Sequence, residues 1–146
     1  MHPLDMSIRL IPHDNPMIRL QLDDMQIFEG RLAEARVFGI SADLSVGSHQ
    51  LILEYMEKTN RDVDQAIEID HIDFEGITAD RFVWVGEYTP DYPEPWASEQ
   101  RALGIELVEK RYDSTFLGWN GVWRLDFETP IFAWIHRIEN LGWVYD

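Results

Sequence analysis

The sequence contains no cysteine, which excludes disulfide bonds, zinc sites built on thiolates and cysteine nucleophiles. It also lacks an apolar run of the roughly 20 residues that a membrane-spanning helix needs. The most apolar stretch, residues 130–144, is interrupted by His136, Arg137 and Glu139. The opening MHPLDMSIRL lacks the basic start and apolar core of a secretory signal, so we expect no signal peptide.

Positive charge is scarce. Lys and Arg total 12 against 27 Asp and Glu, which gives a formal net charge of −15 at pH 7 and a pI near 4.5. A surface of this sign repels phosphate backbones and anionic lipids. Glycine-rich phosphate loops, dinucleotide fingerprints and the Gly-x-Ser-x-Gly elbow of serine hydrolases are also missing. We therefore expect neither nucleic acid nor a membrane among the partners.

Apolar and aromatic residues are plentiful enough for a folded domain. Of 146 residues, 45% are hydrophobic and 12% aromatic, including six Trp, which is unlike a disordered acidic chain. Residues 1–16 carry Pro3, Pro12 and Pro16 and are predicted to form an extended N-terminal arm or a covering edge segment, in which Ile8 and Leu10 could still lie along a sheet. The length predicts that residues 17–146 form a single domain.

Short segments with strand character follow one another along this domain. In residues 17–22, Ile18, Leu20 and Leu22 alternate with polar residues, as in a strand with one buried face. Further strands are predicted in residues 26–28, 36–40, 49–55, 65–74 and 81–87, with turn residues between them. Strands at this spacing, with one convincing helix, predict an all-β fold, an antiparallel β-sandwich.

The last third of the chain carries the clearest local signals. Asn120 and Gly121 lie between two apolar runs and tolerate the positive φ of a type I′ turn, which predicts a hairpin over residues 115–127. Thr129 and Pro130 are suited to the cap and the first position of a helix. A short C-terminal helix is predicted to follow and to end at Gly142, with an apolar stripe of Ile131, Trp134, Ile135, Ile138 and Leu141.

Residues 88–96 combine Tyr88, Tyr92 and Trp96 with three prolines, which predicts a long loop that cannot continue a sheet. Rings on such a stiffened loop can bind a sugar or a protein partner at little entropic cost. The alternative, that the rings fold back over the sandwich, stays open. Trp119, beside the predicted hairpin turn, is a further candidate binding residue.

Asn60, Asp62 and Asp64 offer alternating oxygen ligands in a loop, the kind of site that calcium prefers. The loop lacks the glycine and the final glutamate of a helix-loop-helix calcium site, so a polar turn is the alternative interpretation. The histidines are isolated and show no zinc-binding spacing. We expect His49, at the start of a strand, to be a structural hydrogen-bonding residue.

Residues 44–55, LSVGSHQLILEY, followed by Asp62, Asp64 and residues 66–76, AIEIDHIDFEG, resemble the calcium-dependent xylan-binding type of carbohydrate-binding module. Those modules have a Gly-x-His-x-Leu strand followed by a polar loop. The resemblance covers about the first half of the chain and implies a jelly-roll sandwich. It ends in the loop, where the modules carry an Asn-Asp pair and an Asp-Arg-Asn run and this chain has KTNRDVD over residues 58–64.

Residues 116–127, FLGWNGVWRLDF, together with residues 130–143, resemble the C-terminal end of small proteins of T4-like and cyanobacterial tailed phages. This resemblance implies a virion component, assembled in the host cytoplasm and acting in capsid decoration, in the tail or as a fibre adaptor. Its partners would be other virion proteins or further copies of itself.

The expected function is therefore that of a non-enzymatic structural protein of a tailed-phage virion. The alternative is a glycan-binding module that uses Tyr88, Tyr92, Trp96 or Trp119 to stack on sugars, with or without calcium as a cofactor. An enzyme is the third class, because sandwich folds can host glycoside chemistry, but no catalytic carboxylate pair stands out in this sequence.

Overall fold

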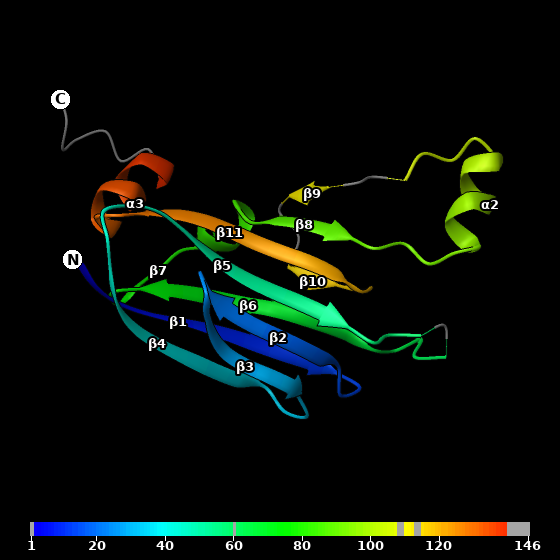
Figure 1. The fold of residues 1–146 in the computed structure, drawn as a ribbon, viewed down its shortest axis with the longest axis horizontal. Coiled ribbons are helices and arrows are strands. Elements are labelled where there is room, and N and C mark those ends of the chain that lie inside the picture. Colours follow the sequence, from blue (N-terminus) through cyan, green and yellow to red (C-terminus); the bar gives the residue numbers. More distant parts are fainter. Residues whose placement is uncertain (1, 60, 108–109, 113–114, 140–146) are drawn as a thin grey trace.

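The computed structural model describes residues 2–59, 61–107, 110–112 and 115–139. Two antiparallel sheets lie one over the other, with the helix α3 (Ile131–Glu139) near one end and the helix α2 (Trp96–Ala102) projecting at the other (Figure 1). The all-β sandwich predicted from the spacing of the strands is confirmed. No helix within the described ranges is long and apolar enough to cross a membrane.

The first sheet, sheet A, has the strand order β10-β6-β1-β4, and β7 pairs with β6. Its strands are β1 (His2–His13), β4 (Arg36–Leu44), β6 (Ala66–Phe74), β7 (Ile77–Thr78) and β10 (Phe116–Leu117). The prediction of an N-terminal arm is wrong, because β1 lies inside this sheet between β4 and β6. Alternate residues of β1, from Leu4 to Leu10, are buried, and this period-2 burial outweighs Pro3 and Pro12 near the strand ends.

The second sheet, sheet B, has the strand order β3-β2-β5-β11-β8-β9. Its strands are β2 (Met17–Leu22), β3 (Met25–Arg31), β5 (Gly47–Met56), β8 (Glu87–Pro90), β9 (Arg111–Tyr112) and β11 (Gly121–Thr129). Alternate residues point into the core, so that Leu20, Leu53 and Trp123 are fully buried while Arg19 and Glu54 face solvent beside them.

Aromatic rings fill the core at the end of the sandwich that α3 covers. The ring of Phe74 lies 5.1 Å from that of Phe82 and 5.5 Å from that of Trp134, centroid to centroid. Phe82 belongs to the short helix α1 (Arg81–Trp84), so the strand predicted over residues 81–87 is wrong. Residues 82 and 83 are both buried, which a helical turn against the core achieves and an alternating strand does not.

The C-terminal helix is confirmed as α3, with Ile131, Trp134 and Ile135 buried. Leu141 and Gly142 lie outside the described residues. The Thr129 hydroxyl donates a hydrogen bond to the carbonyl of Ser45 at 2.6 Å, and among the described residues no helix N–H donates to it. The side chain thus ties the end of β11 to the turn before β5.

The hairpin predicted over residues 115–127 does not form. Its first half is β10, which pairs with β6 in sheet A, and its second half is β11, which pairs with β5 in sheet B. The chain crosses from one sheet to the other through Gly118, Trp119 and Asn120. Each half buries its apolar residues against a different sheet, which outweighs the local preference of Asn-Gly for a hairpin turn.

Candidate functional site

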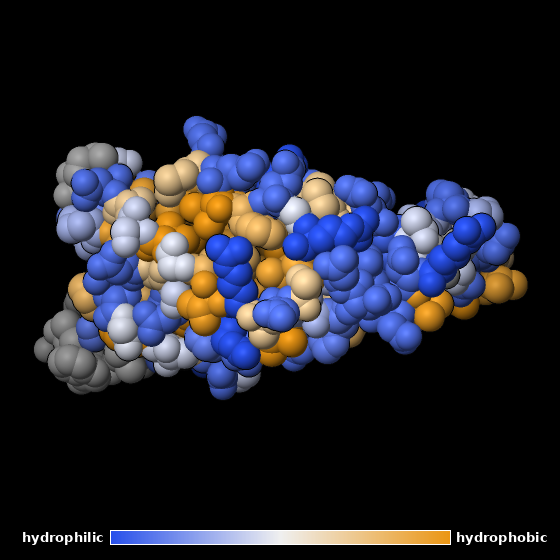
Figure 2. Space-filling view, turned by 90° about the horizontal axis from the view of Figure 1, so that it is seen from below, coloured by the Kyte–Doolittle hydropathy of each residue, from blue (hydrophilic) through white to orange (hydrophobic). Residues whose placement is uncertain are grey.

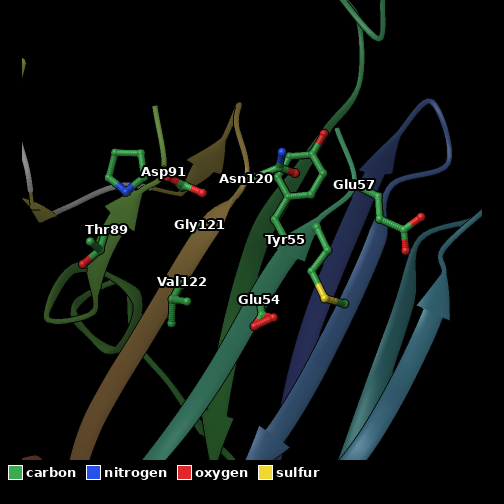
Figure 3. Close-up of a pocket in the computed structure, with 10 residues that line it drawn as sticks. Glu54, Tyr55, Glu57, Thr89, Asp91, Asn120, Gly121 and Val122 are labelled. Carbon is green, nitrogen blue, oxygen red and sulfur yellow. The ribbon is translucent and has the colours of Figure 1, made fainter. Parts of the chain in front are cut away.

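A groove lies on the solvent face of sheet B (Figure 3). It is at the end where β5 stops, which is the end nearer α2 (Figure 1). Here the last residues of β5 and β8 meet the first residue of β11, because Gly121 pairs with Tyr55 on one side and with Pro90 on the other. The groove has a volume of about 740 Å³. Its polar lining residues are Glu54, Glu57, Thr89, Asp91 and Asn120, and its apolar ones include Met56, Pro90 and Val122.

Gly121 sets the shape of the groove floor. A Cβ atom at this position would lie 2.8 Å from the Cα of Pro90 and closer still to the carbonyl oxygen of Thr89. Only glycine therefore lets β8 approach the start of β11 this closely. The neighbouring side chain, Val122, is 37% exposed and supplies an apolar patch on the floor.

Two of the groove carboxylates are held by arginines of neighbouring strands. Arg19 donates two hydrogen bonds to Glu54, at 2.9 and 3.0 Å. Arg31 lies 3.5 Å from Glu57. Among the described residues, the carboxylate of Asp91 has neither an ion pair nor a hydrogen bond, so its oxygens are available to a ligand. The backbone N–H of Asp91 donates to the carbonyl of Asn120 at 2.7 Å.

Asn120 is fixed by a pair of hydrogen bonds to the chain that leaves β5. Its Oδ1 accepts from the backbone N–H of Lys58 at 2.8 Å, and its Nδ2 donates to the carbonyl of Lys58 at 2.9 Å. The Nζ of Lys58 in turn donates to the carbonyls of Gln65 and Gly118, at 2.6 Å each. This rim of the groove is therefore anchored on both sides.

Tyr88 is a core residue and not a stacking platform, which corrects its assignment as a binding residue. It is 2% exposed, its hydroxyl donates to the carbonyl of Trp119, and the same hydroxyl accepts from the Trp119 N–H at 3.3 Å. Burial raises the pKa of Tyr88 to about 12. The segment holding it is the strand β8, so the loop predicted for residues 88–96 begins only after Pro90.

Tyr92 lines a hollow next to the groove, and Trp96, the first residue of α2, packs beside it. Their rings lie 6.0 Å apart, and Trp96 is 42% exposed. A second depression, of about 410 Å³, shares Thr89, Pro90 and Asp91 with the groove and adds Tyr92 and Arg101 to its lining. In Figure 2, apolar atoms are visible among the charged ones at the projecting tip that carries α2. Tyr92 therefore lines the depression next to the groove, and Trp96 packs beside Tyr92 without lining either hollow.

Trp119 precedes Asn120 in the crossing between the sheets and is not among the residues that line the groove. It is half-buried, and the ammonium of Lys58 lies 5.5 Å from the centroid of its ring. The Tyr88 hydroxyl holds the backbone of Trp119. Trp119 therefore belongs to the crossing between the sheets and does not group with Tyr92 and Trp96.

The loop proposed for calcium is closed by its own hydrogen bonds. Oδ2 of Asp62 accepts from the Thr59 N–H at 2.8 Å and from the Thr59 hydroxyl at 3.0 Å, and these bonds lower the pKa of Asp62. Asp64 is exposed, and Asn60 lies outside the described residues. The described part of the chain contains no group of three His, Asp or Glu residues placed to hold a metal. The hydrogen bonds of Asp62 fit the polar-turn interpretation.

Sequence reasoning missed the groove residues Glu54, Thr89 and Asp91. Each belongs to a strand, or the end of one, that meets the others only through sheet pairing. The signal that was present is Asn120-Gly121, whose glycine marks a close approach of two backbones. The prediction for His49 is confirmed, since its ring bonds to Asp23 and Ser45.

No protein-family model and no curated protein sequence matches this chain. Among solved structures, it is similar to "vCBM60 in complex with galactobiose", at 12% identity and a TM-score of 0.52 over 83% of this chain and 96% of that one. It is also similar to a selenomethionine form of vCBM60, described with "two families of calcium-dependent carbohydrate binding modules", at 13% identity and a TM-score of 0.50. That match covers 84% of this chain and 89% of the other.

Neither neighbour is described as a virion protein, so the virion role stays a prediction. Likeness at these identities establishes the fold, which agrees with the jelly-roll sandwich that the first sequence resemblance implied. The chain therefore has the β-sandwich fold of a carbohydrate-binding module.

Proposed function

We propose that this protein is a non-catalytic carbohydrate-binding module whose glycan lies in the groove over the end of sheet B. The observation that carries the proposal is the lining of that groove, in which Thr89 of β8 and Glu54 of β5 lie on either side of the apolar Val122, and the carboxylate of Asp91 follows at the end of β8. The two neighbouring folds, one of them solved with galactobiose, support the same class of ligand.

A sugar ring matches this lining. Its hydroxyl groups donate hydrogen bonds, and a carboxylate such as that of Asp91 accepts two of them at once. Its carbon-bound hydrogens form an apolar face that can pack on Val122 and Pro90. The carboxylates of Glu54 and Glu57 add negative charge, so we expect neutral glycans to bind and uronic acid polymers to be repelled.

A longer glycan would continue from the groove toward Tyr92. The two depressions share Thr89, Pro90 and Asp91, so the path between them is continuous. The exposed ring of Trp96 offers a stacking surface next to Tyr92. Short oligosaccharides are therefore expected to use the groove alone, and longer ones both parts.

The carboxylates favour binding over catalysis. Glycoside hydrolysis needs two carboxyl groups flanking the bond, one of them able to give a proton to the leaving oxygen. Here Glu54 accepts both of its short hydrogen bonds from the Arg19 guanidinium, and Glu57 faces Arg31. Neither is arranged as a proton donor toward the groove.

The test is a glycan array followed by calorimetric titration of the best neutral oligosaccharide. Asp91→Asn keeps the shape but weakens the acceptors, and it is expected to lower the affinity about tenfold. Asp126→Asn is the matched control, because Asp126 lies on the same face of β11 outside the groove and pairs with Arg124. The proposal would be contradicted if no glycan on the array bound, or if both variants lost the same amount of affinity.

A further inference from the structure

The loop cluster formed by Lys58, Gln65 and the crossing Gly118–Asn120 is built around an ammonium group. The Nζ of Lys58 donates hydrogen bonds of 2.6 Å to the carbonyl of Gln65 and to the carbonyl of Gly118. These two carbonyls belong to segments that are 53 residues apart in the sequence but adjacent in the fold. One positive charge therefore joins the connection between β5 and β6 to the crossing between β10 and β11.

The groups around the Lys58 ammonium are of the kinds that stabilise a positive charge. Partial burial lowers the pKa of Lys58, and the nearby carboxylates of Asp62 and Asp64 oppose that shift. The ring of Trp119 faces the Nζ at 5.5 Å and adds a cation–π contact. Carbonyl oxygens, carboxylates and an aromatic face thus surround one positive charge.

The oxygen atoms around Lys58 do not leave a site for a calcium ion while the ammonium is present. Calcium needs six to eight oxygen ligands, drawn largely from carboxylates and backbone carbonyls. The carbonyls of Gln65 and Gly118 are used by the ammonium, and Oδ2 of Asp62 is used by the N–H and hydroxyl of Thr59. A divalent ion at this place would have to displace the lysine and would meet its charge.

We propose that the ammonium of Lys58 is the resident cation of the loop cluster, and that the groove beside it works without calcium. The part of this inference that concerns the groove rests on the proposed function. The part that concerns the cation does not, because it follows from the contacts of Lys58 alone.

Lys58 acts on the groove as a positioning residue. Its backbone N–H and carbonyl hold the side-chain amide of Asn120, and the carbonyl of Asn120 accepts from the N–H of Asp91. When the ammonium is removed, the two segments it joins are free to separate, and the displacement reaches Asp91 through Asn120. The positive charge at this position is therefore supplied by the chain itself.

The experiment measures thermal unfolding and calcium binding without any sugar. Lys58→Met keeps an unbranched side chain that is one atom shorter and removes the charge, leaving two carbonyls without their donor. We expect its Tm to fall by about 5 °C or more. Lys110→Met is the matched control, because Lys110 is the chain's other lysine and makes an exposed ion pair of 3.3 Å with Glu87. Its Tm should stay within about 1 °C of wild type.

Wild-type protein should have the same Tm in calcium and in chelator, and calorimetric titration with calcium chloride should give no binding heat. A rise in the wild-type Tm with calcium, or equal Tm values for the two lysine variants, would overturn the inference. Glycan titration in chelator is a separate arm. If no glycan binds under any condition, the proposed function fails while the Tm and calcium data still decide the role of Lys58. Glycan binding that requires calcium would overturn the inference and leave the proposed function standing.

Discussion

The Nδ1 of His49 lies 2.7 Å from Oδ2 of Asp23, although 26 residues separate them in the sequence. The Nε2 of the same ring lies 2.7 Å from the carbonyl oxygen of Ser45, and His49 is 7% exposed. Both partners accept hydrogen bonds, so a ring that donates from both nitrogens, the imidazolium, satisfies the site fully. The ring joins the turn after β2 to the turn before β5, at the end of sheet B away from the groove.

This contact predicts that the protein becomes less stable as the pH rises through neutrality. Burial by itself lowers the pKa of His49, but the hydrogen bonds to Ser45 and Asp23 outweigh it and raise the pKa above its ordinary 6.5. A pKa raised on folding contributes stability that is complete below 6.5 and is lost as the pH passes the folded-state value. Urea unfolding of wild type should give a larger free energy at pH 6 than at pH 8.

His49→Asn removes the titrating group and should flatten this difference. The carboxylates with lowered pKa values, such as those of Asp62 and Asp70, titrate at far lower pH and do not contribute in this window. Equal pH dependence in wild type and His49→Asn would show that another group is responsible.

Gly121→Ala should be strongly destabilising. The added Cβ would lie 2.8 Å from the Cα of Pro90, and the backbone of β8 cannot move aside as a flexible side chain does. We expect the free energy of unfolding to fall by about 1–3 kcal/mol. Gly39→Ala in β4 is the control, because its Cβ meets nothing within 4 Å, and its effect should stay within about 0.5 kcal/mol. Similar urea midpoints for the two variants would refute the role of Gly121.

Tyr88→Phe tests whether this residue is structural. The change removes the hydroxyl that both donates to and accepts from the backbone of Trp119, and should cost about 1–2 kcal/mol of stability. Tyr112→Phe loses an exposed hydrogen bond to Glu87 and should change stability by less than about 0.5 kcal/mol. If Tyr88→Phe is as stable as wild type, the hydroxyl does not hold the crossing between the sheets.

Trp96→Ala should affect glycans according to their length. Because the exposed ring packs beside Tyr92 and outside the groove, its loss should weaken binding of long oligosaccharides about fivefold and leave short ones unchanged. Leu103→Ala, at the end of the same projecting helix, removes a side chain that is 74% exposed and should have no effect on either. Calorimetric titration with oligosaccharides of increasing length measures this effect. If Trp96→Ala lost the same affinity for short and long oligosaccharides, Trp96 would not act on the longer ones alone.

The sequence was sufficient where burial follows one local period. The alternation of Ile18, Leu20 and Leu22 predicts β2, and the stripe through Trp134 predicts α3, because each element buries the face that its own pattern marks. The predictions were wrong where the local sequence favours one structure but pairing with strands far away in the sequence stabilises another. Asn120-Gly121 favours a hairpin, yet the strands on either side of it belong to different sheets.

The groove could not be predicted from the sequence, because its lining residues come from several strands and no single strand carries a recognisable pattern. Glu54, Thr89 and Val122 become neighbours only through the register of β5, β11 and β8, which an isolated sequence does not specify. The aromatic side chains are visible in the sequence, but the binding role predicted for them does not fit all of them. Tyr88 is a core residue, whereas Tyr92 lines the depression next to the groove and Trp96 packs beside Tyr92.

The most direct test of glycan binding in this groove is a titration followed by amide NMR, with a neutral galacto-oligosaccharide added to the isotope-labelled protein in chelator. The account predicts that the largest shifts occur at residues 54–57, 89, 91 and 120–122, which line the groove. It also predicts that His49, at the far end of sheet B, stays unchanged. The account is contradicted if the spectrum does not change at saturating sugar, or if the shifts gather on sheet A.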